Sequence, residues 1–201
     1  DCGIRIPETD SRGDCPACGG LLEIAHELSS DPSSLKEMFA ERRAQLSGCE
    51  QSGVWRYREL VLPTAADVDV VTHPEGNTPL MRREPLSRWT GVDDLWIKHE
   101  GHNPTGSFKD RGMTVAITQA RRTGARAVAC ASTGNTSASL AAYAAQAGVP
   151  ALVFVPAGRV ALGGAGRELG LERVALLGAG REIRVEHGAL LLGRLQPIAR
   201  G

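Results

Sequence analysis

Residues 125–155 read ARAVACASTGNTSASLAAYAAQAGVPALVFV, and they contain the clearest fold signal in the chain. Two short apolar runs, at residues 127–130 and 151–155, flank an alanine-rich helical segment at residues 136–147. Apolar runs of this length are typical of strands that are buried on both faces, as in parallel sheets. The order of strand, helix and strand therefore predicts two parallel strands joined by a right-handed crossover.

The same alternation continues on both sides of this unit. Residues 95–98 and 108–122 form an expected strand and helix before it, and residues 166–169 and 173–177 form a short expected helix and a fourth strand after it. Strands that alternate with helices predict an α/β fold, here with a parallel sheet and helices on both faces. Ligands of such sheets bind beyond the carboxyl ends of the strands, so the loops at that edge form the candidate site.

The first third of the chain has a weaker pattern. Apolar side chains at near-helical intervals predict one helix over residues 29–46, with Asp31 or Ser34 as its cap. Residues 55–62 are expected to be extended, and prolines interrupt the passage that follows them. This part of the chain therefore looks like an appendage to the more regular α/β domain.

The composition excludes several classes of protein. The chain has 201 residues with 23 Lys and Arg against 23 Asp and Glu, so it lacks the basic character of a general nucleic-acid binder. No apolar stretch approaches the roughly 18 residues typical of a membrane helix, and residues 1–10 have no feature of a signal peptide. We therefore expect a cytoplasmic protein that acts on a small molecule, and a homodimer stays open.

Cysteines are concentrated at the start of the chain. Cys15 and Cys18 form a Cys-x-x-Cys turn, and Cys2 could supply a third ligand to one tetrahedral metal ion such as zinc. A fourth cysteine at the usual spacing would precede the first residue. Two interpretations stay open, a zinc-ribbon-like site and reduced thiols in a turn. We place these cysteines and the expected helix in an N-terminal segment, residues 1–50, and assign residues 51–201 to a partial α/β domain.

The loop at residues 101–112, GHNPTGSFKDRG, leads into an expected helix and places Lys109 in its first turn. The positive end of the helix dipole favours the neutral form of a lysine there, which is nucleophilic and forms imines with aldehydes. A solvated surface lysine is the alternative. We expect no catalytic role for Asp110 or Arg111, because an acidic residue suits a helix start and the arginine could pair with it or with the sheet edge.

A second loop follows the strand at residues 127–130. Residues 131–139, ASTGNTSAS, place hydroxyl groups, a carboxamide and backbone N–H groups at the start of the next helix, which suits a carboxylate or a phosphate. Because Ser, Thr and Asn are ordinary helix caps, this loop alone is weak evidence. It becomes part of a site because Lys109 is expected at the same edge of the sheet.

The two loops resemble those of threonine synthases. These are pyridoxal-phosphate (PLP) enzymes of the tryptophan-synthase β-subunit fold, called fold type II, and serine/threonine dehydratases are a close alternative within it. The resemblance covers roughly residues 2–170. Its motifs are NPTGSFKDRG at residues 103–112, STGNTSAS at 132–139, GNTPL at 76–80, WRY at 55–57 and PAGRVALG at 156–163.

The resemblance implies a role for each matched residue. Lys109 would hold PLP as a Schiff base and move protons, and Asn135 would donate a hydrogen bond to the phenolic oxygen of the cofactor. Ser132, Thr133 and Thr136 would hold the carboxylate of an amino-acid substrate. The implied reaction converts O-phospho-L-homoserine and water to L-threonine and phosphate, with the cofactor as electron sink.

The sequence also departs from the family. Gly164 stands where the family usually has a lysine, and residues 178–201 do not match it. The resemblance further implies that a glycine-rich phosphate loop and a hydroxyl group at the pyridine nitrogen come from a second half, which this sequence does not contain. Three hypotheses therefore stay open: the N-terminal part of a threonine synthase, a catalytically inactive remnant of one, and a binding module with a zinc-ribbon-like segment.

Overall fold

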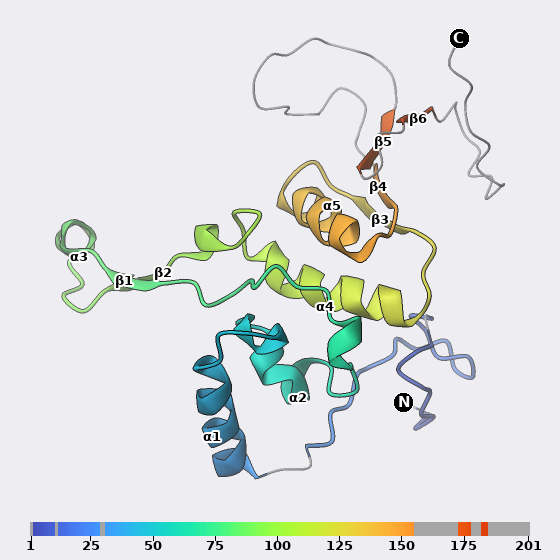
Figure 1. Ribbon diagram of the computed structural model, residues 1–201, viewed down its shortest axis with the longest axis horizontal. Helices are drawn as coiled ribbons and strands as arrows, with labels where there is room; N and C mark the ends of the chain where they lie inside the picture. The colour runs from blue at the N-terminus through green and yellow to red at the C-terminus, as the bar shows by residue number, and fades with distance from the viewer. Residues whose placement is uncertain (1, 11, 29–30, 155–172, 178–181, 185–201) are drawn as a thin grey trace.

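The fold is taken from a computed structural model (Figure 1). It describes residues 2–10, 12–28, 31–154, 173–177 and 182–184. The expected helix at residues 166–169, the PAGRVALG segment and Gly164 lie outside the described residues. Four short 3-10 turns lie among the helices and strands: Cys49–Gln51, Trp55–Tyr57, Asp67–Asp69 and Glu100–His102.

The main sheet has four strands in the order β3 (Val128–Ala131), β4 (Ala151–Phe154), β5 (Arg173–Leu177) and β6 (Glu182–Arg184). Strands β3 and β4 are parallel, and helix α5 (Asn135–Ala147) connects them, as the sequence predicts. Strands β5 and β6 run antiparallel to their neighbours, so the expectation of a wholly parallel sheet is wrong here. The apolar run that identifies β5 does not fix its direction, because strands of either direction can be apolar.

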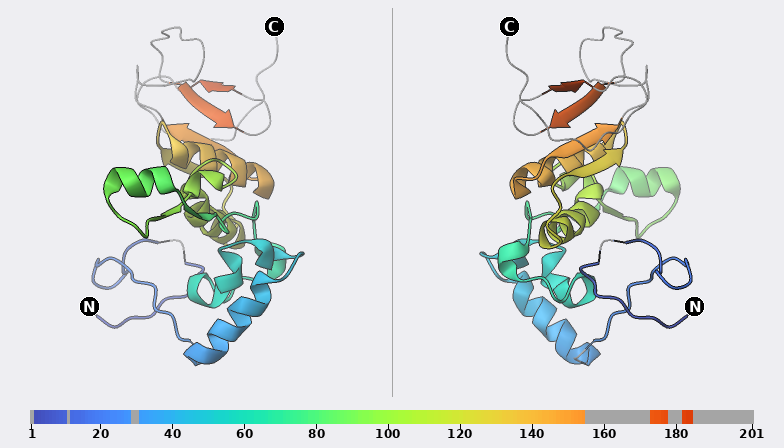
Figure 2. Two further views of the ribbon diagram at one scale, coloured as in Figure 1. Left: turned by 90° about the vertical axis from the view of Figure 1, so that its left-hand side faces the viewer. Right: turned by 90° about the vertical axis from the view of Figure 1, so that its right-hand side faces the viewer.

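Two helices cover the parallel strands in successive layers. Helix α5 contacts β3 and β4, and helix α4 (Lys109–Arg122) packs against α5 (Figure 2). Both helices lie on one side of the described sheet. The buried core of this layer consists of Val71, Ile117, Leu140, Tyr143, Ala144 and Ala151.

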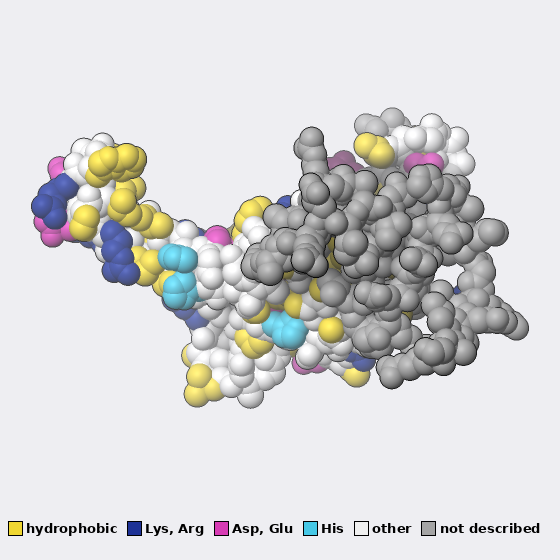
Figure 3. Space-filling view, turned by 90° about the horizontal axis from the view of Figure 1, so that it is seen from above, with side chains coloured by type: hydrophobic (Ala, Val, Ile, Leu, Met, Phe, Trp, Pro, Cys, Tyr) yellow, Lys and Arg dark blue, Asp and Glu magenta, His cyan; other side chains and the backbone are white. Residues whose placement is uncertain are grey.

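A two-stranded arm projects from this body (Figure 1). Strand β1 (Leu80–Arg82) pairs antiparallel with β2 (Trp96–Lys98), and helix α3 (Glu84–Thr90) forms the tip. The predicted strand at residues 95–98 is thus confirmed, but it does not belong to the main sheet as expected, because β1 is its partner. Hydrophobic side chains gather on this arm (Figure 3), and both strands are exposed at Leu80 and Trp96.

The predicted N-terminal helix is present as α1 (Pro32–Arg43). Its cap is Asp31, whose carboxylate accepts the N–H groups of Ser33 and Ser34 at 2.9 and 3.2 Å. This arrangement stabilises the helix start, since the first N–H groups of a helix have no internal partner. Among the helices that the structure describes, none is long and apolar enough to cross a membrane.

Residues 55–62 are not extended, which corrects the prediction. They form the 3-10 turn already named and helix α2 (Arg58–Val61). Ser52 starts the turn, because its hydroxyl accepts the N–H groups of Val54 and Trp55 at 3.0 and 3.2 Å. The Trp55 ring is fully buried, and its indole N–H donates to the Thr114 hydroxyl at 2.7 Å. This contact attaches the turn to α4.

Candidate active site

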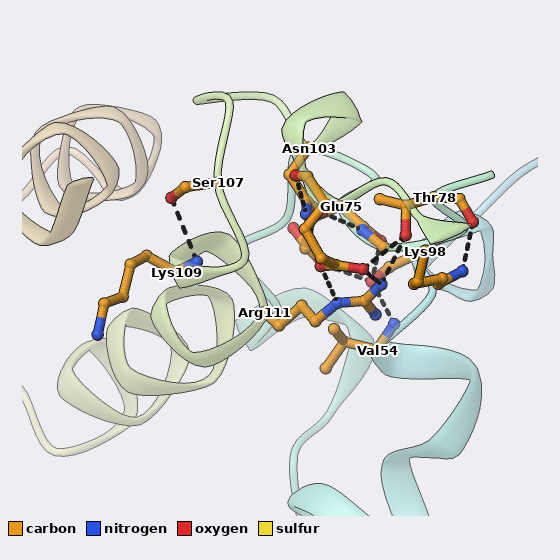
Figure 4. A network of polar contacts seen from close by, with 11 residues as sticks. Val54, Glu75, Thr78, Lys98, Asn103, Ser107, Lys109 and Arg111 are labelled. Carbon is orange, nitrogen blue, oxygen red and sulfur yellow. Dashed lines mark hydrogen bonds and ion pairs between the residues drawn. The ribbon is translucent and has the colours of Figure 1, made fainter. Parts of the chain in front are cut away.

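Lys109 is the first residue of α4, and its backbone is fixed while its amine has no partner among the described residues. Its N–H donates to the Ser107 hydroxyl at 3.3 Å (Figure 4). Its ε-amino nitrogen lies 4.9 Å from the centroid of the Phe108 ring. That amine has no hydrogen bond and no ion pair with any described residue. The side chain is half-buried, and its amine is available to a ligand because no described residue bonds to it.

Asp110 connects the lysine loop to helix α5. Its side chain is fully buried and accepts the N–H of Thr105 at 2.7 Å and the hydroxyl of the same residue at 2.5 Å. It also accepts the hydroxyl of Ser139, on α5, at 2.6 Å. Three donors satisfy the buried carboxylate, which would otherwise be costly to bury. Asp110 therefore holds the lysine loop against α5. The helix dipole, which explains an acidic residue at this position, does not predict this contact.

The predicted carboxylate-binding loop lies at the start of α5, beside the lysine loop. Asn135 precedes Ser139 by one helical turn, so both lie on the face that meets α4. Thr133 and Asn135 are exposed, and Ser132 and Thr136 are half-buried. Within the described part of the chain, no side chain caps α5. The structure thus brings all the predicted cofactor and substrate residues to two neighbouring helix starts.

Arg111 pairs with Glu100, which follows strand β2, and not with Asp110, one of the two partners that the sequence left open. Its Nε and one terminal nitrogen lie 2.8 and 2.9 Å from the two carboxylate oxygens of Glu100. Thr78 and Asn103 donate to the same carboxylate at 2.7 and 2.9 Å. The Arg111 hydrogen bonds are the main reason that the pKa of Glu100 is lowered to about 2. This network ties the GNTPL motif to the lysine loop.

Glu75 is a buried residue that the sequence reasoning did not identify. Its carboxylate accepts the Tyr143 hydroxyl at 2.7 Å, the Thr72 hydroxyl at 3.0 Å and the N–H of His73 at 3.1 Å. The Ser52 hydroxyl is a further donor. Burial, reinforced by the carboxylate, raises the pKa of Tyr143. Glu75 therefore joins α5 to the segment before the GNTPL motif.

Two glycines allow the backbone around Gly76 to pass close to the backbone at Gly53. The N–H of Gly53 donates to the Glu75 carbonyl oxygen at 2.7 Å. A Cβ atom on Gly53 would lie 2.3 Å from the backbone nitrogen of Asn77. Gly76 has φ +79°, a conformation that favours glycine. The glycine of GNTPL thus serves backbone packing.

The three predicted metal ligands also come together. The sulfur atoms of Cys2, Cys15 and Cys18 all lie within 4.8 Å of one another. The Cys-x-x-Cys turn is closed by the N–H of Cys15, which donates to the Gly20 carbonyl at 2.7 Å. Backbone N–H groups, that of Ala17 first, lower the pKa of Cys15 to about 7. Three converging thiols are three of the four ligands of a structural zinc site.

The sequence of this chain is similar to those of known enzymes. A family model described as pyridoxal-phosphate dependent enzyme matches residues 71–188. The chain is 45% identical over 163 residues to a threonine synthase of Methanosarcina acetivorans, which covers 81% of this chain and 37% of that protein. It is 49% identical over 146 residues to a threonine synthase of Methanocaldococcus jannaschii, which covers 73% of this chain and 34% of that protein.

The chain therefore spans about a third of the length of these relatives. A threonine synthase of Synechocystis is 51% identical over 128 residues, which covers 60% of this chain and 34% of that protein. The family match extends over more than half of the chain and includes both loops of the candidate site. The chain belongs to the family of pyridoxal-phosphate dependent enzymes.

Proposed function

We propose that this chain is part of a threonine synthase, which converts O-phospho-L-homoserine and water to L-threonine and phosphate. The observation that carries the proposal is the amine of Lys109, which no described residue pairs with, at a helix start that Asp110 fixes beside the hydroxyl-rich start of α5. The identity to threonine synthases supports this choice over serine/threonine dehydratases. The chain spans about a third of those relatives, so the activity is proposed for the protein of which it forms a part.

The described residues fit one side of the PLP molecule. The cofactor aldehyde requires an amine, and the Lys109 amine has no competing partner among the residues described. The phenolic oxygen requires a donor, and the exposed carboxamide of Asn135 lies at the adjacent helix start. PLP, when bound, supplies the electron sink that stabilises negative charge on the substrate carbons.

The chain's own residues would bind the substrate and move its protons. Ser132, Thr133 and Thr136, with the N–H groups of the first turn of α5, offer donors to the substrate carboxylate. The positive end of the helix dipole favours that negative charge. The Lys109 amine would act as general base and acid at the adjacent carbons. Asp110 would keep the lysine and the carboxylate site at a fixed separation.

For the whole protein we propose fold type II, with a parallel sheet that has helices on both faces and is built from residues 51–201 and the part beyond this chain. Residues 1–50 form the N-terminal segment in this proposal. The parallel pair of β3 and β4 with its crossover helix supports this architecture. The antiparallel pairing of β5 departs from it.

We also propose that Cys2, Cys15 and Cys18 bind zinc. The convergence of their sulfur atoms supports this proposal. Metal analysis of the purified chain should find one zinc ion per chain, and Cys18→Ser should reduce that content strongly. Cys130→Ser is the control, because Cys130 lies outside the cluster. Equal zinc in both variants, or none in the unmodified chain, would leave the cysteines as reduced thiols.

The test of the lysine assignment uses an unusual property of the sequence. The chain has only three lysines, Lys36, Lys98 and Lys109. After incubation with PLP, gel filtration and borohydride reduction, peptide mapping should find the label on Lys109. Lys109→Ala should abolish the retained absorbance band, and Lys36→Ala, on the exposed side of α1, should preserve it.

Other results of this experiment would contradict the Lys109 assignment or limit what this polypeptide can do. A label on one of the other two lysines, or an equal band in Lys109→Ala, would contradict the assignment. If the unmodified chain retains no absorbance band, the hypothesis that this polypeptide is an inactive remnant is favoured. Turnover of O-phospho-L-homoserine then separates a folded half-site from a working enzyme.

A further inference from the structure

A cationic pocket lies between the end of α1 and the GNTPL motif. Its volume is about 550 Å³, and it is lined by Arg43, Arg56, Lys98 and residues 77–80. Three of these residues are cations and none is a carboxylate. The volume is in the range of small-molecule sites, which is roughly 300–1,000 Å³. The arrangement favours an anion that is larger than a chloride ion.

Arg56 gives this pocket its unusual character. Its side chain is about nine-tenths buried, and its Nε atom has no hydrogen-bond partner among the described residues. It forms no ion pair within the part of the chain that is described, and its guanidinium carbon lies 4.9 Å from the centroid of the Tyr57 ring. Glu59 is the nearest carboxylate in sequence, but Arg42 occupies both of its oxygens at 2.7 Å. A buried cation without a counter-charge is costly, and a bound anion would remove that cost.

The fold brings the other two cations to the same place. Arg42 donates to the Arg56 carbonyl oxygen at 2.9 Å, which holds the last turn of α1 against this segment and places Arg43 at the pocket. Lys98 extends from β2, and its amine donates to the Thr78 carbonyl oxygen. Basic residues suit the last turn of a helix, which explains Arg43 without a ligand. The helix dipole does not account for Arg56, which is buried and lies outside α1.

We propose that this pocket binds a phosphorylated small molecule. Arg43, Arg56 and Lys98 would bind the phosphate, since guanidinium groups match the geometry of phosphate oxygens and the lysine adds a point charge. Pro79 and Leu80 provide the apolar wall for the carbon skeleton. The ligand class follows from the charge and the volume of the pocket, and it does not depend on the proposed enzymatic activity.

The pocket is separate from the Lys109 amine. Lys109 and Arg111 are two residues apart on α4, so their side chains leave the helix about 200° apart. Arg111 points toward Thr78, at the pocket wall, and the lysine points to the other side (Figure 4). One molecule bound at the amine would therefore not occupy the cationic pocket, and the two sites can be tested independently.

The test is a calorimetric titration of the 201-residue chain with inorganic phosphate at constant ionic strength. Arg43→Gln and Lys98→Gln change exposed residues and should each weaken binding about tenfold, the effect of losing one charge-assisted hydrogen bond. Arg56→Gln should weaken it at least as much. Arg121→Gln removes one exposed charge from α4 and is the matched control, with affinity unchanged.

Further arms identify the ligand class. Glycerol 3-phosphate should bind more tightly than inorganic phosphate, because its carbon skeleton contacts the apolar wall. Lys109→Ala should retain phosphate binding, since its amine points away from the pocket. The proposal is overturned if the unmodified chain does not bind phosphate, if Arg121→Gln weakens binding as much as the pocket variants, or if Lys109→Ala abolishes it. Equal affinity for both ligands would overturn the small-molecule part.

Discussion

The starts of α4 and α5 meet at the candidate active site, yet they are built in opposite ways. At α4, Ser107 accepts the N–H groups of Lys109 and Asp110 at 3.3 and 3.4 Å through its hydroxyl and carbonyl oxygens. At α5, no side chain caps the helix, and the N–H groups of Asn135 and Thr136 have no partner among the described residues. Unpaired N–H groups at a helix start form an anion site. The backbone at Lys109 is thus ordered by Ser107, whereas the first N–H groups of α5 have no partner among the described residues.

Asp110→Ala should have the largest effect on stability, because it removes the contact between the two helix starts. The variant leaves the donors of Thr105 and Ser139 unpaired in a buried place, so we expect the free energy of unfolding to fall by about 3–5 kcal/mol. Urea unfolding followed by circular dichroism measures the change. Asp93→Ala, at an exposed position, should stay within about 0.5 kcal/mol of the unmodified chain. Similar losses in both variants would show that Asp110 does not connect the helices.

The second-largest effect is expected from acid, which should weaken the contacts at the start of α4. The pKa of Glu100 is about 2 in the folded chain against an ordinary value of 4.5, mainly because of Arg111. A lowered folded pKa adds stability that is present above pH 4.5 and is lost as the pH falls toward 2. Glu100→Gln should cost about 1–2 kcal/mol at pH 7 and should lose less stability over that pH range.

A matched variant makes the acid experiment specific. Glu37→Gln changes an exposed carboxylate on α1 and should keep the pH dependence of the unmodified chain. If Glu100→Gln and the unmodified chain lost the same amount of stability between pH 4.5 and 2, the Arg111 pair would not be the source of the acid sensitivity.

The sequence predicts the part of the molecule that depends on local pattern. The crossover unit of β3, α5 and β4 follows from apolar runs and an alanine-rich helix, and Lys109 follows from its motif. The partners of Glu75 could not be predicted in this way, because Tyr143 is 68 residues away along the chain. The same limit applies to strand pairing, since β2 finds its partner in a strand that no periodicity identified.

Tyr143→Phe should sharpen the contrast within α5. The middle of this helix is tied to Glu75 by the Tyr143 hydroxyl at 2.7 Å, whereas its start is open. Loss of this one hydrogen bond to a buried carboxylate should reduce the free energy of unfolding by about 1–2 kcal/mol. Tyr57→Phe is the control, since the Tyr57 hydroxyl forms no hydrogen bond with the described residues. Equal effects in the two variants would contradict the role of Glu75.

Asn135→Ala should have the smallest effect on stability and a large effect on cofactor retention. The Asn135 side chain is exposed and contacts no described partner, so the free energy of unfolding should change by less than about 0.5 kcal/mol. PLP would lose the donor to its phenolic oxygen, so the absorbance band should shift or weaken. Gln146→Ala, at the exposed far end of α5, should change neither quantity. A residue with only a structural role would affect stability and leave the absorbance band unchanged. If Asn135→Ala lowered the free energy of unfolding and kept the band, the start of α5 would be part of the scaffold and not an open ligand site.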